Sequence, residues 1–161
     1  MTANAIASMP PHARVWVYQA NEPFEATTIP EVGQYLERFT EQWTSHSKQL
    51  KAVGALLHNR FVILAVDESQ AGASGCSIDS SVQFLQQLGA HYQRDLFDRM
   101  RFSYEKEGQV HTVDHETFSN LYANGSINDE TIVFDPLVDN VEKWQAAFRK
   151  PLKDSWHKRF V

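Results

Sequence analysis

The stretch "ESQAGASGCSIDSS", residues 68–81, gathers many of the side chains that could carry chemistry in this chain. It holds two glycines, five serines and the only cysteine, Cys76. It follows an apolar run, "RFVILAV", and leads into a helical pattern. The first backbone N–H groups of a helix lack partners inside the helix, so this turn combines hydroxyl, amide and thiol groups. Three uses are open: a nucleophile, an anion site, or a helix start.

The first use is nucleophilic catalysis by Cys76. A thiolate just before a helix is stabilised by the helix dipole and gains reactivity. A cysteine enzyme also needs a base, usually histidine. His46 is the catalytic candidate that we pair with Cys76, while His58, His91 and His157 are alternatives. His46 lies near the end of the first predicted helix, where capping of that helix also explains it.

The second use is binding of a small anion such as a phosphate or carboxylate. Glycines free the backbone, and serines with a helix N-terminus supply donors. The turn is not a Walker A loop, because no Gly-Lys pair occurs in the chain, so a P-loop ATPase is excluded. The acidic residues that flank the turn weaken the binding of a phosphate, because like charges repel. The candidate ligand-binding residues are Gly72, Ser74, Gly75, Ser77, Asp79 and, from a wall formed by residues 153–160, His157.

The third use is structural. Ser77 or Ser80 would cap the helix, with Gln83 at capping-box spacing from Ser80. The glycines would then only turn the chain, and Cys76 would pack as a small apolar group.

Neither a metal nor a cofactor is expected. His111 and His115 are four residues apart, but Asp114 interrupts the helix between them, so they do not share a helical face. The tail "KDSWHKRF", residues 153–160, is basic and aromatic. Such a segment stacks on nucleic acid, or folds back and buries its rings. We expect it to fold back, because a free tail would expose two large aromatic residues to water.

Composition narrows the class of protein. The apolar fraction of 42% and the 161-residue length suit one folded domain with a sizeable core. A net charge of −5 argues against a general nucleic-acid binder. One cysteine cannot form an internal disulfide, which favours a reducing, cytoplasmic location. No apolar run is long enough to span a membrane. We therefore expect a soluble cytoplasmic protein.

Periodicity predicts the elements that position these residues. Apolar and β-branched runs predict strands at 13–20, 51–57, 60–66 and 130–134, and two more strands around Glu107-Gly108. Helical spacing predicts helices from Thr28 to about 45–47, from Ile78 to Tyr92, over 115–123 and over 139–148. The runs 51–57 and 60–66 are separated by His58-Asn59, which predicts a hairpin.

This order of elements predicts an α+β fold. Residues 13–106 follow the strand–helix–strand–strand–helix–strand order of a split βαβ, ferredoxin-like core. We expect a flexible leader over residues 1–12 and a small C-terminal α/β extension or lobe over 107–161.

Several strings carry a resemblance. "ARVWVYQ", "NRFVILAVDES", "AGASGCSIDSSV", "DETIVF" and "KDSWHKRF" resemble an uncharacterised bacterial family often labelled "ABC transporter ATPase". The Walker A lysine and the ABC signature that this label needs are absent, and the family implies no established activity. Residues 107–134 are similar to GYF-type modules, a resemblance that implies binding of proline-rich peptides. The aromatic signature of those modules is absent.

Three functions therefore remain open. The leading one is a ligand-binding or regulatory module with an anion-accepting turn at 72–79. The second is a small enzyme with Cys76 as nucleophile. The third is an interaction protein that uses its basic aromatic C-terminal segment to bind a protein partner.

Overall fold

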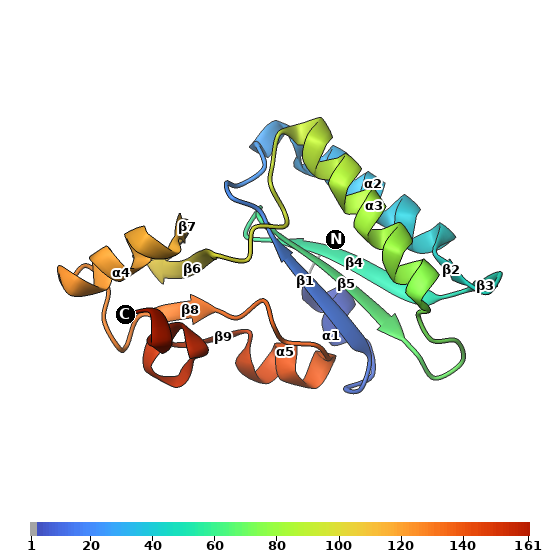
Figure 1. Cartoon of the computed structure of the whole chain (residues 1–161). Helices are drawn as coiled ribbons and strands as arrows, with labels where there is room; N and C mark the ends of the chain where they lie inside the picture. The colour runs from blue at the N-terminus through green and yellow to red at the C-terminus, as the bar shows by residue number, and fades with distance from the viewer. Residues whose placement is uncertain (1–2) are drawn as a thin grey trace.

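Residues 3–161, which the computed structural model describes, form a mixed α+β structure with two main antiparallel sheets. The strands of the first sheet are, in order, β1 (Arg14–Gln19), β5 (Phe61–Asp67) and β4 (Lys51–Leu57). Those of the second are β7 (Gln109–Asp114), β6 (Arg101–Lys106), β8 (Ile132–Phe134) and β9 (Arg149–Pro151). Figure 1 shows the two sheets at opposite ends of the molecule. The predicted α+β class is confirmed.

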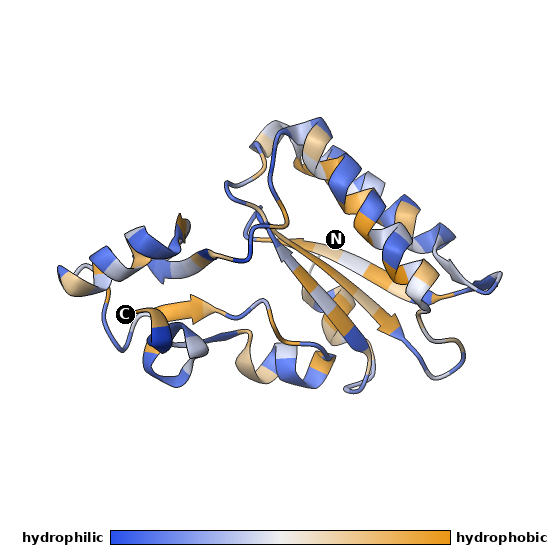
Figure 2. Ribbon diagram, in the orientation of Figure 1, coloured by the Kyte–Doolittle hydropathy of each residue, from blue (hydrophilic) through white to orange (hydrophobic). Residues whose placement is uncertain are grey.

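Both faces of the first sheet are covered by helices, which explains why β5 is apolar along its length. The helices α2 (Ile29–Gln42) and α3 (Gly75–Tyr92) lie over one face, and α1 (Ala3–Ala7) and α5 (Val141–Ala147) over the other (Figure 1). Side chains alternate along a strand, so β5 supplies two separate cores. Figure 2 shows the apolar residues along this strand. Val62, Leu64 and Val66 face α2 and α3, and Phe61, Ile63 and Ala65 face the opposite core.

The predicted hairpin between β4 and β5 is confirmed. Its strands pair from Lys51 with Asp67 to Leu57 with Phe61. Three residues, 58–60, separate the paired residues Leu57 and Phe61, and two of them, His58 and Asn59, have φ values of 50° and 55°. The Arg60 N–H donates to the Leu57 carbonyl at 3.1 Å, which closes a β-turn with positive φ at both central positions. His and Asn tolerate a positive φ better than most residues.

The second sheet buries its own core under the C-terminal helices. The helix α4 (His115–Ala123) and the short 3-10 helices η2 (Leu152–Asp154) and η3 (Trp156–Phe160) supply residues to it. The aromatic residue Phe102 lies at its centre, with its ring centroid 5.3 Å from that of Phe118 and 4.9 Å from that of Phe160. The C-terminal segment therefore folds back, as its aromatic content predicted.

The ferredoxin-like arrangement is not confirmed. Three strands have the order β1-β5-β4 that it requires, but β6, which should lie beside β1, belongs to the second sheet. The edge of β1 is occupied instead by the segment before α5. Arg14 forms an antiparallel bridge with Asn140, and Val15 N–H donates to the Asp139 carbonyl at 2.9 Å.

The two ends of the chain share the core of the first sheet. Within the predicted leader, Ile6 of α1 is fully buried, so the described part of that segment packs on the core. The predicted boundary at residue 106 falls inside the β6–β7 hairpin, whose strands pair from Arg101–Asp114 to Lys106–Gln109. Phe134 and Trp144 from beyond that boundary belong to the same cluster as Phe61.

The remaining elements are short. The 3-10 turn η1 (Ala26–Thr28) leads into α2, and a small hairpin of β2 (Thr44–Ser45) and β3 (Lys48–Gln49) follows it. Across residues 3–161, no helix combines the length and the apolar character needed to cross a membrane.

Candidate functional site

The glycine–serine turn is built around a capping box. The helix α3 begins at Gly75, three residues before the predicted start. Its N-cap is Ser74, not Ser77 or Ser80 as the sequence suggested. The Ser74 hydroxyl accepts from the Ser77 amide at 3.2 Å, and the Ser77 hydroxyl accepts from the Ser74 amide at 2.5 Å. These reciprocal bonds use donors that an anion site would need.

A carboxylate already lies on this turn. Glu68 Oε2 accepts from the Ala73 amide at 2.9 Å. A Cβ at Gly72 would lie only 2.8 Å from that oxygen, so glycine allows the carboxylate to approach the backbone. The turn therefore supplies its own anion, which repels a second one. Asp79 is exposed on α3, just after the first turn of the helix.

Cys76 is exposed on the same turn, and His46 is exposed in the β2–β3 hairpin. Because α2 ends at Gln42, His46 does not cap it. It occupies a left-handed turn position, with a φ of 50°. The contact that joins this region to α3 comes from Trp43, which is buried and whose Nε1–H donates to the Ser77 carbonyl at 2.8 Å.

The capping box leads to a stability prediction. Ser74→Ala removes the acceptor for the Ser77 amide, so we expect the free energy of unfolding to fall by about 1 kcal/mol. Cys76→Ser alters an exposed side chain, and we expect a change within about 0.5 kcal/mol. Urea unfolding followed by circular dichroism measures both. A larger loss for Cys76→Ser than for Ser74→Ala would show that the sulfur is a packing group.

His157 is a core residue. Its side chain is fully buried, with its ring 3.9 Å from that of Trp156 and 5.1 Å from that of Phe102. Its Nδ1 shares a hydrogen bond of 2.6 Å with the Ser155 hydroxyl. Burial lowers the pKa of His157 to about 4, so the imidazole is neutral at neutral pH. The structure thus places this predicted ligand residue out of reach of solvent.

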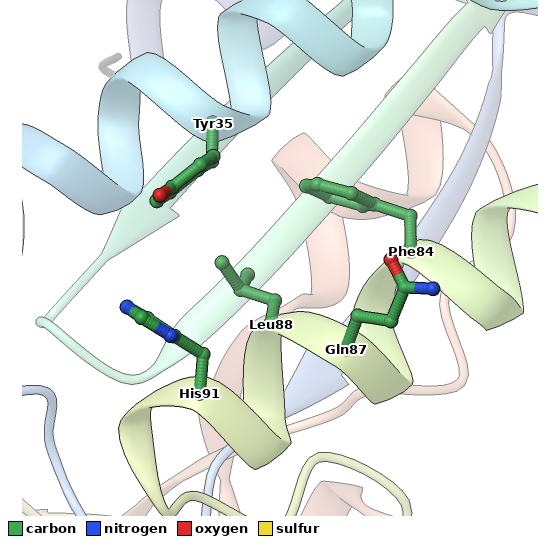
Figure 3. Close-up of a pocket in the computed structure, with 5 residues that line it drawn as sticks. All are labelled: Tyr35, Phe84, Gln87, Leu88 and His91. Carbon is green, nitrogen blue, oxygen red and sulfur yellow. The ribbon is translucent and has the colours of Figure 1, made fainter.

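A first cavity, the helix groove, lies between α2 and α3. Figure 3 shows Tyr35 projecting from α2 toward Phe84, Leu88 and His91 of α3. The groove has a volume of about 270 Å³, and the rings of Tyr35 and His91 meet edge to face at 6.2 Å. Among the described residues that line the groove, only Tyr35 is both large and apolar and also exposed to solvent.

The end of this groove is fixed by a hydrogen bond between the helices. The Tyr92 hydroxyl donates to Glu31 Oε1 at 2.6 Å. Burial and this bond to a carboxylate raise the pKa of Tyr92 well above its ordinary value, so the hydroxyl stays a donor.

A second cavity, the junction pocket, lies where the two sheets meet. Its walls come from β1, from the connection between α3 and β6, from the connection between β8 and α5, and from η3. Its volume is about 250 Å³. The residues that line it include Tyr18, Leu96, Phe97, Arg99, Leu137 and Trp156.

The junction pocket presents ring faces and apolar side chains to solvent. Phe97 is 38% exposed and Leu137 is 56% exposed, and both rank among the few large apolar residues of 3–161 that are open to water. The rings of Tyr18 and Phe97 meet edge to face with centroids 5.5 Å apart. Burial raises the pKa of Tyr18, so its phenol is protonated and can donate a hydrogen bond.

The polar groups around this pocket are held in place by bonds to the protein. Trp156 Nε1–H donates to Asp135 Oδ1 at 2.9 Å. The side-chain amide of Gln19 donates through Nε2 to the Arg101 carbonyl at 2.7 Å, and its Oε1 accepts from the Ser103 hydroxyl at 2.5 Å. The lining is therefore preorganised, which lowers the entropy lost on binding.

Comparisons of the chain with protein-family models, with curated proteins and with solved structures find no match. Within residues 3–161, no group of three or more His, Cys, Asp and Glu side chains is arranged to hold a metal ion.

The sequence did not predict the junction pocket. Residues 153–160, which include Trp156, were expected to form a wall of a site at the 72–79 turn and not of this pocket. Phe97 and Leu137 were missed because they stand in the polar connections "RDLFDRM" and "DPLVDN", outside any periodic element. The available signal was the apolar pairs Leu96-Phe97 and Leu137-Val138 within these polar loops, because apolar residues that gather at a surface are typical of interaction sites.

Proposed function

We propose that this protein is a non-catalytic binding module that holds an extended, proline-containing peptide segment in the junction pocket. The observation that carries this proposal is the coincidence of exposed apolar side chains with a preformed aromatic cavity. Phe97 and Leu137 are both exposed and both line it. Exposed apolar clusters on folded domains are typical of interaction sites.

The size of the pocket favours a segment of a larger partner. A volume of about 250 Å³ is below the ~300–1,000 Å³ of sites that enclose a drug-sized ligand. It is suited to one or two anchoring side chains of a chain that continues across the surface. Tyrosine, tryptophan and arginine, which are enriched in interaction sites, all occur in its lining as Tyr18, Trp156 and Arg99.

Proline suits this lining for two reasons. Aromatic grooves recognise polyproline II segments, whose rings pack on flat side-chain faces. The carbonyl groups of such a segment make no internal hydrogen bonds and are free to accept from the Tyr18 phenol or the Arg99 guanidinium.

This proposal is favoured over the two uses of the glycine–serine turn. The amides of Ser74 and Ser77 are bound within the capping box, and Glu68 places a negative charge on the turn. Neither Cys76 nor His46 lines the helix groove or the junction pocket.

The proposal is tested by titration with Ac-Pro-Pro-Leu-Pro-Pro-Leu-NH₂, followed by isothermal calorimetry. Ac-Gly-Gly-Leu-Gly-Gly-Leu-NH₂ is the control peptide, with the same leucines on a flexible backbone. We expect the proline peptide to bind at least about tenfold tighter than the glycine peptide. The proline peptide already adopts the polyproline II conformation in solution, so it loses less conformational entropy on binding. The indole N–H signal of Trp156 should move during the titration.

Two matched variants locate the site. Phe97→Ala should weaken binding by about tenfold or more, because it removes an aromatic anchor. Tyr35→Ala in the helix groove is the control, since Tyr35 is 37% exposed and Phe97 is 38% exposed. Absence of binding at millimolar peptide, equal affinity for the two peptides, or an equal loss in Tyr35→Ala would each overturn the proposal.

A further inference from the structure

Two hydrogen-bond donors that line the junction pocket have no acceptor in the protein. They are the Tyr18 hydroxyl and the Arg99 guanidinium. The side chains of Gln19 and Trp156, which also line the pocket, are bonded to protein acceptors. Across residues 3–161, no hydrogen bond or ion pair involves the Tyr18 hydroxyl or the Arg99 guanidinium. These two donors are therefore available to a ligand.

The two donors lie close to each other and are open to solvent. Burial raises the pKa of Tyr18, and the positive charge of Arg99 opposes that rise. A charge affects a phenol in this way only across a short distance, because water and salt screen charges that lie farther apart. Neither group is among the side-chain atoms of 3–161 that are closed to water and lack a partner, and Arg99 is exposed. A polar group that enters the pocket can therefore contact both donors.

The charge of Arg99 is not compensated within the lining. Among the described residues that line the pocket, Asp98 is the acidic one, and it already has a cationic partner. Its Oδ2 lies 3.2 Å from Arg101 Nε, at an angle that gives an ion pair without a hydrogen bond, and its Oδ1 accepts from a backbone amide. Asp135, which accepts from the indole of the lining, pairs with Lys150 at 2.8 Å. Both pairs are neutral as a whole, so Arg99 leaves the pocket with one positive charge.

We propose that the peptide held in the junction pocket carries a glutamate or aspartate beside its apolar anchor, and that Arg99 and the Tyr18 hydroxyl bind this carboxylate. The inference rests on the function proposed for the pocket and adds the charge of the peptide that it selects. A carboxylate has two acceptor oxygens, so one can accept from the guanidinium and the other from the phenol. A single positive charge matches a carboxylate better than a phosphate group, which carries about two negative charges.

The exposure of Arg99 identifies the source of the carboxylate as a side chain. Because Arg99 is open to solvent and not enclosed by the pocket, a chain can pass it without ending there. The apolar walls of the same pocket, Phe97 and Leu137, hold the neighbouring anchor of that chain. The rest of the protein works against an acidic peptide, since its net charge of −5 repels negative charge at long range. A preference for acid must therefore come from the local cation.

The test compares Ac-Glu-Pro-Pro-Leu-Pro-Pro-Leu-Glu-NH₂ with the same peptide carrying glutamine at both ends, by isothermal calorimetry. An acid at each end makes the result independent of the direction in which the chain lies. The glutamate peptide should bind about fivefold tighter at low salt, and the difference should shrink as salt is added, because ions screen an exposed pair. If the glutamine peptide binds and the glutamate peptide gains nothing, this inference fails alone. If neither peptide binds, the function proposed for the pocket fails as well.

Variants assign the preference to the two donors. Arg99→Gln should bind both peptides equally with unchanged circular dichroism, whereas Arg99→Lys keeps the charge and should retain a preference of at least about twofold. Tyr18→Phe, which keeps the ring, should reduce the preference by about twofold or more. Arg38→Gln is the control, because Arg38 is also exposed but lies beside Tyr35, with its guanidinium 6.0 Å from that ring.

Three results would refute the assignment. The first is a preference that survives in Arg99→Gln, and the second is an equal loss in Arg38→Gln, which would indicate a general effect of charge. The third concerns the source of the carboxylate. Ac-Pro-Pro-Leu-Pro-Pro-Leu with a free C-terminal carboxylate should bind more weakly than the glutamate peptide, and tighter binding would show that the site takes a chain end and not a side chain.

Discussion

Acidification from pH 6.5 to pH 4 is expected to remove about 3 kcal/mol of stability through His157 alone. Its side chain is fully buried, and burial is the main reason that its pKa falls from 6.5 to about 4. Asp135 nearby opposes this shift, and Lys150 adds to it. A difference of one pKa unit corresponds to about 1.4 kcal/mol, which gives the expected size. Domains of this kind are stable by only about 5–15 kcal/mol, so the loss is a large fraction.

The sign follows from the protons bound in each state. The unfolded chain protonates this imidazole near pH 6.5, whereas the folded protein does so only near pH 4. Between these values the unfolded state binds more protons, so stability falls as the pH falls. Above pH 6.5 the contribution is fully present, and below pH 4 it declines no further.

Urea unfolding at pH 7, 6, 5 and 4.5 measures this slope, and His157→Gln should flatten it. Glutamine keeps a polar side chain beside Ser155 but does not titrate. His58→Asn is the matched control, because the pKa of His58 is also lowered and adds a slope of the same sign. Four carboxyl groups also have lowered pKa values, those of Asp67, Asp114, Asp129 and Asp135. Their contribution to the stability of the protein is lost only below about pH 3.8, which is outside the measured range. An unchanged slope in His157→Gln would contradict the assignment.

Local pattern predicted most of the elements. The six-residue apolar run of β5, residues 61–66, requires a strand covered on both faces, and His58-Asn59 lies at the centre of the hairpin turn that its place between two strands suggested. Element ends were less accurate, because competing caps are close together in sequence. Ser74, Ser77 and Ser80 all suit an N-cap, and in the structure the reciprocal bonds between Ser74 and Ser77 make Ser74 the cap.

The arrangement of the strands could not be read from local pattern. The position of β6 depends on which segment takes the edge of β1, and residues 139–141 take it from more than a hundred residues away. The same limit applies to the sites. Trp156 could be identified as aromatic, but its place beside Tyr18 and Phe97 requires three segments to meet. His157 could be identified as a histidine, but its burial depends on Phe102 and Phe118 from other elements.

Phe61→Ala is expected to lower the free energy of unfolding by about 3–5 kcal/mol, because it opens a cavity in a core shared by both halves of the chain. Phe61 is fully buried, with its ring 5.2 Å from those of both Phe134 and Phe148. Those two residues lie beyond the boundary at residue 106 that the sequence suggested. The substitution should therefore lower the stability of both sheets.

Two tryptophan signals test whether the sheets unfold together. Trp43 belongs to the core beneath α2 and α3, and Trp156 packs on the second sheet. In Phe61→Ala both indole signals should disappear at the same, lower urea concentration, as a single cooperative unit requires. Phe118→Ala, which empties the second core alone, should also shift both signals. If Phe118→Ala shifts only Trp156, residues 107–161 form a separate lobe after all, and Phe61→Leu, a milder truncation, then measures how much of the stability still crosses between them.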